Sequence, residues 1–225
     1  MPEANWTATI PHGLPSNSFR PSFDQGSYLA FLGRLTAEKG PEDAIRIARA
    51  AGMPLRIAAK IPRGETAYFK RQLEPHVDGR AVQLVGEVDE AKKQPFLAGA
   101  AALLFPIDWP EPFGLVMIEA MACGTPVIAY RSGSVPEVVE DGVTGFIVEN
   151  EEQAVRAVGD LGLLDRRKVR ARFEERFSAD RMARAYECAY LGLISAAAGH
   201  PAAASSAKAE RRLGTKPADE LPASN

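Results

Sequence analysis

The sequence predicts an α/β fold: a Rossmann-like parallel sheet with helices on both faces. Short runs alternate with amphipathic segments, the runs are nearly continuous in apolar residues, and glycine or proline closes three of the six. A strand buried on both faces has this continuous apolar character, and strands that alternate with helices build a parallel sheet. Ligands of such sheets bind beyond the carboxyl ends of the strands, so functional residues are expected there.

The first three strands are predicted at 28–33, 55–60 and 81–86, where "YLAFLG", "LRIAAK" and "AVQLVG" are short, mostly apolar runs. The segment 41–52, "PEDAIRIARAAG", separates the first two. It has proline at the first helical position, acids in the first turn and glycine at its end, which together indicate a helix. A second helix is predicted at 65–77.

The second half of the sequence continues the alternation. Strands are predicted at 101–106, 126–130 and 145–148, and helices at 89–99, 114–123, 151–162, 166–176 and 179–196. Pro95 lies inside one of these helices and is expected to kink or shorten it, because proline cannot donate a backbone hydrogen bond.

Composition divides the chain into three parts. Residues 1–26 are rich in Pro, Ser and Asn and are expected to form an extended lead-in that resembles an interdomain connection. Residues 27–197 hold the predicted sheet and helices. Residues 198–225 are rich in Ala, Ser and Pro with few large apolar groups, so they are expected to be a disordered tail.

Charge and cysteine content restrict the partners. The formal net charge is -2 and the Lys and Arg residues are dispersed, so no nucleic-acid partner is expected. A small molecule or another protein is expected instead, and peripheral membrane contact is left open without direct support. Cys123 and Cys188 are far apart and lack metal-ligand spacing, which favours a reducing cytoplasmic compartment. No signal peptide or membrane-spanning stretch is predicted.

The first predicted strand ends in a basic loop. Gly33 closes the strand, and Arg34 and Lys39 flank a tight turn before a helix start. Two cations, free backbone N–H groups and a positive helix end suit a pyrophosphate. The alternative is a solvated turn with surface charges. The loop is neither a Walker motif nor G-x-G-x-x-G, so ATPase and NAD-binding functions lack their usual signature.

The fourth predicted strand is followed by the segment "PIDWPEPFGLVMIEAMACG". This segment places Glu111 before a helix and Glu119 inside it. The backbone N–H groups near Phe113, Gly114 and Leu115 have no helical partner and can hold a phosphate or sugar oxygen. Carboxylates only accept hydrogen bonds, so they bind vicinal hydroxyls well. Alternatively, Glu111 serves only the helix dipole and Glu119 lies on a solvated face, although the neighbours of Glu119 are apolar.

Four segments, "FLGRLTAEKG", "LVGEV", "PEPFGLVMIEAMACGTPVIA" and "GSVPEVVEDGVTGFIV", occur in order and at fitting spacings. Together they resemble the donor-binding domain of retaining glycosyltransferases of family 4, which have the GT-B fold. The resemblance runs from about Ala8 to Leu193. It implies the C-terminal half of a GT-B fold.

The resemblance also implies site residues. Arg34 and Lys39 would bind the donor diphosphate and, with Glu111, serve catalysis. Glu111, the first acid of an E-x7-E motif, would contact the donor sugar, and Glu119 would accept from the ribose hydroxyls. Further donor contacts would come from Gly33, Gly86, Val88, Phe113, Gly114 and Leu115, with the stretch from Gly86 to Val88 against the nucleobase. No metal or cofactor is implied, because cationic side chains and a helix end replace Mg²⁺.

The sequence departs from the family pattern. A GT-B enzyme has an acceptor half first, but only about 27 residues precede the first predicted strand. A separate N-terminal acceptor-binding domain is therefore an expected partner, and His12 is not a candidate for the family's catalytic histidine. "IAAK" replaces a glycine-rich strand end, which leaves the role of Lys60 open.

The predicted function is transfer of a hexosyl group, with retention, from a UDP-, GDP- or ADP-linked sugar to an acceptor hydroxyl. Half a cleft can bind the donor, whereas acceptor positioning needs the other half. One alternative is therefore a non-catalytic nucleotide-sugar-binding module. Another is a related GT-B enzyme, a nucleotide-sugar epimerase or a phosphorylase. The nucleotide, the sugar and the acceptor stay undetermined by the sequence.

Overall fold

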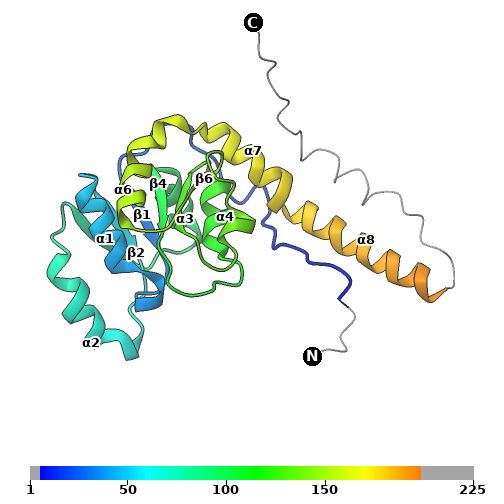
Figure 1. The fold of residues 1–225 in the computed structure, drawn as a ribbon, viewed down its shortest axis with the longest axis horizontal. Helices are drawn as coiled ribbons and strands as arrows, with labels where there is room; N and C mark the ends of the chain where they lie inside the picture. The colour runs from blue at the N-terminus through cyan, green and yellow to red at the C-terminus, as the bar shows by residue number, and fades with distance from the viewer. Residues whose placement is uncertain (1–5, 199–225) are drawn as a thin grey trace, which may run out of the picture. The chain divides into compact units, whose positions relative to one another are not determined.

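A computed structural model of the chain describes residues 6–198 (Figure 1). These residues belong to two compact units. One is Thr9–Ala183, and the other contains the described residues up to Ala8 and from Arg184 onward. Residues 199–225, which make up nearly all of the predicted tail, lie outside the described residues.

The unit Thr9–Ala183 is built on one parallel sheet (Figure 1). Its strands are β1 Leu29–Leu32, β2 Leu55–Ala58, β3 Val82–Gly86, β4 Ala102–Phe105, β5 Val127–Tyr130 and β6 Gly145–Val148. Each lies within the run predicted for it. The strand order is β3-β2-β1-β4-β5-β6, so the chain changes direction across the sheet between β1 and β4. This pair marks the switch point at which open α/β sheets bind ligands.

Helices alternate with the strands. They are α1 Pro41–Ala50, α2 Thr66–Tyr68, α3 Glu90–Ala98, α4 Leu115–Ala122, α5 Val135–Val138, α6 Glu151–Gly159, α7 Arg166–Phe177 and α8 Ala179–Ala197. Shorter helical turns are η1 Ala37–Lys39, η2 Arg63–Glu65, η3 Phe69–Leu73, η4 Glu74–His76 and η5 Asp160–Leu163. No helix among residues 6–198 has both the length and the apolar character to cross a membrane.

The sheet separates two cores. Successive side chains of a strand point to opposite faces. Leu103 and Val127 are buried with α3, α4 and α7 on one face. Leu104 and Ile128 are buried with α1 and α6 on the other. This arrangement confirms the predicted fold class, a Rossmann-like parallel sheet covered on both faces.

Two predicted helices differ in detail from the structure. Residues 65–77 form successive short α, π and 3₁₀ turns instead of one α-helix. Pro75, at the start of the last turn, has no N–H to continue the α-helical hydrogen bonds. Pro95 lies inside α3 without ending it, and the helix continues to Ala98.

The lead-in segment from Thr9 packs against the closing helices of the same unit. The Leu14 N–H donates to the Phe177 carbonyl at 2.9 Å, and the Ala179 N–H donates to the Leu14 carbonyl at 2.9 Å. Phe19 is 5% exposed and belongs to the core on the α4 face.

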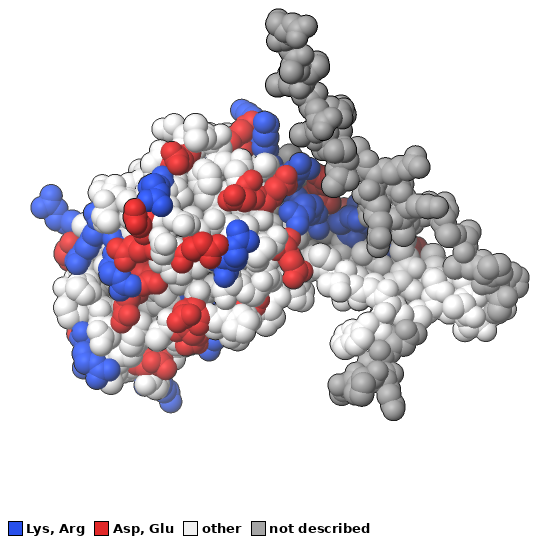
Figure 2. Space-filling model, viewed as in Figure 1, with Lys and Arg blue, Asp and Glu red and all other residues white. Residues whose placement is uncertain are grey.

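Surface charge is mixed. On the face shown in Figure 2, Lys and Arg side chains are interspersed with Asp and Glu. Several charged side chains of the chain pair on neighbouring helical turns, as Arg156 does with Glu152 at 2.6 Å. Such exposed pairs stabilise a fold by only about 0–1 kcal/mol each.

Candidate functional site

A pocket of about 240 Å³ opens at the carboxyl edge of the sheet, between the loops that follow β1 and β4. Its lining residues are Phe31, Leu32, Gly33, Arg34, Lys39, Phe105, Glu111, Gly114, Leu115 and Val116. The pocket therefore lies at the switch point of the sheet. It brings the basic loop after β1 and the helix start after β4 together, as the sequence predicted.

Lys39 and Glu111 form an ion pair in this pocket. Their side chains are only 15% and 14% exposed. The Trp109 indole Nε1–H donates to the same carboxylate at 3.0 Å, and Lys39 Nζ lies 4.7 Å from the centroid of the Trp109 ring. The ammonium group is thus held by one carboxylate and one aromatic face. Trp109 is not among the site residues predicted from the sequence, although it stands two residues before Glu111.

Arg34 is the exposed cation of the pocket. Its side chain is 62% exposed, and the one ion pair that it forms among residues 6–198, with Glu38, spans 3.8 Å. The pKa of Glu38 is lowered, mainly because its carboxylate accepts a hydrogen bond from the Glu38 backbone N–H. The nearby positive charges of Arg34 and Lys39 lower this pKa further. So long and exposed a pair is weak, which leaves the guanidinium available to an anion in the pocket.

A glycine joins the two loops that frame the pocket. Gly40 has φ 70°, and a Cβ atom there would lie 1.9 Å from the Pro106 carbonyl oxygen. The Asp108 N–H donates to the Glu38 carbonyl at 2.9 Å beside it. The loop after β1 therefore touches the loop after β4 backbone to backbone, and this contact holds Lys39 next to Glu111.

The loop after β5 supports Glu111 from the other side. A Cβ atom on Gly133 would lie 2.4 Å from the Glu111 backbone, and the Ser134 N–H donates to the Glu111 carbonyl at 2.9 Å. The Ser132 hydroxyl donates to the Trp109 carbonyl at 2.6 Å. Three loops thus fix the position of one carboxylate.

Helix α4 begins at the floor of the pocket. Gly114 precedes it with φ 75°, and no side chain caps the helix. The first N–H groups of a helix have no internal acceptor, so those of Leu115 and Val116 can serve a ligand anion. Phe113 points elsewhere: its ring packs edge-on against His12, with centroids 4.9 Å apart, and against Phe177 at 6.1 Å.

Glu119 lies one turn further along α4 and does not line this pocket. Its Oε1 accepts from Lys93 Nζ at 2.9 Å, and Lys93 also binds Glu90 at 2.8 Å. Burial lowers the pKa of Lys93, but its hydrogen bonds to Glu90 and Glu119 outweigh that effect and leave the pKa raised. Lys93 is not among the site residues predicted from the sequence.

The predicted site residues therefore fall into two groups. The pocket brings together Gly33, Arg34, Lys39, Glu111, Gly114 and Leu115. Gly86, Val88, Phe113 and Glu119 lie outside its lining. Among the residues that the structure describes, no His, Cys, Asp and Glu side chains form a group suited to a metal ion.

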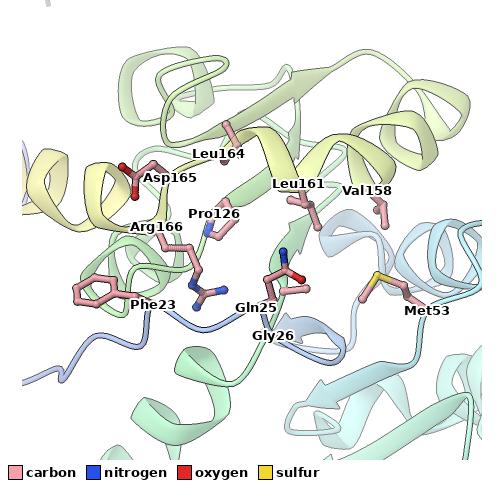
Figure 3. Close-up of a pocket in the computed structure, with 12 residues that line it drawn as sticks. Phe23, Gln25, Gly26, Met53, Pro126, Val158, Leu161, Leu164, Asp165 and Arg166 are labelled. Carbon is pink, nitrogen blue, oxygen red and sulfur yellow. The ribbon is translucent and has the colours of Figure 1, made fainter.

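A second cavity, of about 410 Å³, opens near the residues that precede β2, β4 and β5 (Figure 3). Arg166 lies in its wall and is 8% exposed, and burial lowers the pKa of its guanidinium. That group already donates to the Ser22, Ala98 and Ala100 carbonyls and to the Thr125 hydroxyl, at 2.7–3.1 Å. Arg166 therefore ties loops together at the amino edge of the sheet, away from the switch point.

Comparison with known proteins places this chain in a family. The sequence profile of the family described as "Glycosyl transferases group 1" matches residues 17–178. Glycogen synthase of Mycobacterium tuberculosis is 35% identical over 153 residues, which cover 64% of this chain and 36% of that protein. D-inositol 3-phosphate glycosyltransferase of Acidothermus cellulolyticus is 30% identical over 180 residues, covering 69% and 39%.

Solved structures show the same fold. AviGT4, a glycosyltransferase involved in avilamycin A biosynthesis, superposes with a TM-score of 0.71 at 26% identity. The superposition covers 83% of this chain and 58% of AviGT4.

The chain spans less than half the length of the two curated relatives above: its matches cover 36% and 39% of them. Since the family profile extends over most of the described residues, the chain belongs to the glycosyl transferases group 1.

Proposed function

We propose that this chain binds a nucleotide-sugar donor in the pocket between β1 and β4, as the donor half of a retaining glycosyltransferase that transfers a hexosyl group. The observation that carries the proposal is the convergence of Arg34, Lys39, Glu111 and the start of α4 on one pocket. Two cations and free helix N–H groups favour a diphosphate. The neighbouring carboxylate favours sugar hydroxyls.

The donor diphosphate lies, in this proposal, between Arg34, Lys39 and the N–H groups of Leu115 and Val116. Lys39 then shares its ammonium group between the diphosphate and Glu111, its partner in the structure. Glu111 accepts from the hydroxyls of the transferred sugar. These cationic and N–H donors stabilise the leaving diphosphate without a metal ion.

The proposed reaction is a displacement on one face of the sugar. The acceptor oxygen forms a bond to the anomeric carbon on the face from which the diphosphate departs. The bond from that carbon to the diphosphate oxygen breaks, and the acceptor proton passes to the departing diphosphate. Negative charge grows on the leaving group, so Arg34 and Lys39 stabilise the transition state more than the bound donor.

The acceptor is proposed to be positioned by a separate N-terminal acceptor-binding domain. The chain covers 36% and 39% of the two curated relatives, so residues beyond it are available for that role in proteins of this group. One alternative is a nucleotide-sugar-binding module without transfer activity.

Calorimetric titration of the full chain with UDP, GDP and ADP tests donor binding. We expect one of the three to bind, and Arg34→Ala to weaken that binding about tenfold, because one charge-assisted hydrogen bond is lost. Arg156→Ala is the matched control: it removes an arginine of similar exposure, 59% against 62%, that also pairs with a glutamate one turn away.

Equal binding by the Arg34→Ala and Arg156→Ala variants would reject the proposed pocket. Absence of binding for all three nucleotides would reject donor binding altogether. Transfer assays with an added acceptor half then decide between enzyme and module, since a module binds the donor but yields no glycosylated product.

A further inference from the structure

Lys93 connects two elements, the end of β3 and helix α4, that the family resemblance assigns to one nucleotide. It stands in the second turn of α3, which Asp89 caps by accepting from the Lys92 N–H at 2.9 Å. Directly before that cap lies the stretch from Gly86 to Val88, expected to face the nucleobase. The Lys93 side chain crosses to α4 and binds Glu119 Oε1 at 2.9 Å.

Both side chains of the Lys93–Glu119 pair are mostly buried. Lys93 and Glu119 are 16% and 13% exposed, and the neighbours of Glu119 on α4, Ile118 and Ala120, are fully buried. A carboxylate in such surroundings is costly unless it is paired. Glu90, the other partner of Lys93, is 84% exposed, so its ion pair with Lys93 is worth far less than the buried pair with Glu119.

The geometry leaves half of the Glu119 carboxylate for a ligand. Lys93 occupies Oε1, and no hydrogen bond to Oε2 is present among the residues that the structure describes. A carboxylate held by one oxygen keeps a fixed orientation, and its second oxygen is then ready for a hydroxyl donor without rearrangement.

We propose that Lys93 is a positioning residue for ribose recognition: its ion pair fixes Glu119 so that the free carboxylate oxygen accepts from the ribose hydroxyls. This inference rests on the proposed nucleotide binding. It predicts that the preference of the site for a ribonucleotide over its 2′,3′-dideoxy analogue depends on Lys93, although Lys93 itself does not touch the ribose.

The test compares two ligands on four forms of the full chain. The ligands are the best-bound nucleoside diphosphate and its 2′,3′-dideoxy analogue. The chain forms are the unaltered protein, Lys93→Met, Lys93→Arg and Lys92→Met. The last is the matched control, because it removes the same charge from an exposed neighbouring residue. For the unaltered chain we expect a preference of about tenfold or more for the ribonucleotide, the value of a hydrogen bond to a charged group.

The expected pattern is specific to positioning. Lys93→Met should reduce the preference to less than about threefold while the affinity for the dideoxy analogue stays unchanged, which also shows that the variant is folded. Lys93→Arg should restore most of the preference, and Lys92→Met should leave it unchanged.

Two results would overturn the inference. If Lys93→Met keeps the full preference, or weakens both ligands equally, Lys93 has only a structural role, and the proposed function stands. If the unaltered chain binds no nucleoside diphosphate, the proposed function fails and this inference fails with it.

Discussion

Lys39→Met is expected to weaken nucleoside diphosphate binding by about 100-fold and to raise the barrier for glycosyl transfer by about 2–4 kcal/mol. Lys39 is the enclosed cation of the pocket, with a side chain 15% exposed, whereas Arg34 is 62% exposed. An ammonium group shielded from water interacts more strongly with a phosphate than an exposed one. Titration measures the first effect, and transfer with an added acceptor half measures the second.

Glu111→Gln provides the control for this variant. Lys39→Met also leaves the Glu111 carboxylate, 14% exposed, with Trp109 as its remaining hydrogen-bond partner among the described residues. The double variant, which carries both Lys39→Met and Glu111→Gln, no longer buries an unpaired carboxylate. It should therefore unfold at a higher temperature than Lys39→Met alone, yet bind the diphosphate no better. Recovery of binding in the double variant would mean that Lys39 serves only to neutralise Glu111.

Gly40→Ala is expected to destabilise the fold by about 3 kcal/mol or more and to abolish nucleotide binding. A Cβ atom at this position would lie 1.9 Å from the Pro106 carbonyl oxygen, so one loop must move away from the other. That movement separates Lys39 from Glu111. Thermal unfolding and nucleotide titration of the variant measure the two effects.

Gly52→Ala separates the steric effect from the backbone effect. Gly52 has φ 67°, close to the 70° of Gly40, but a Cβ atom there would meet nothing within 4 Å. This control should lose only about 1 kcal/mol of stability and keep full binding. Similar losses in the two variants would show that the contact with Pro106 does not hold the pocket together.

Much of the fold follows from local pattern. Strands buried on both faces need continuous apolar runs, so runs such as 101–106 and 126–130 identify themselves in the sequence. The segment 65–77 was predicted less well, because its apolar residues suit one α-helix while Pro75 prevents continuous hydrogen bonding. Helix propensity alone does not tell whether the apolar pattern or the missing N–H of Pro75 decides the conformation of this segment.

The candidate site was predictable where it depends on strand ends. Arg34, Lys39, Glu111 and Gly114 follow two strands, and a switch point makes these strands neighbours. Trp109 was missed because an aromatic residue before a helix is equally compatible with packing. The sequence also gave no sign that Lys93 reaches across to Glu119, since helix-to-helix pairing depends on tertiary geometry.

A crystal structure of the chain with its nucleotide-sugar donor tests the central claim most directly. We predict the two phosphates within hydrogen-bond distance of Lys39 and Arg34 and of the N–H groups that open α4, with the sugar against Glu111. A donor bound instead in the cavity beside Arg166, or with its phosphates away from Lys39 and the start of α4, would contradict the account.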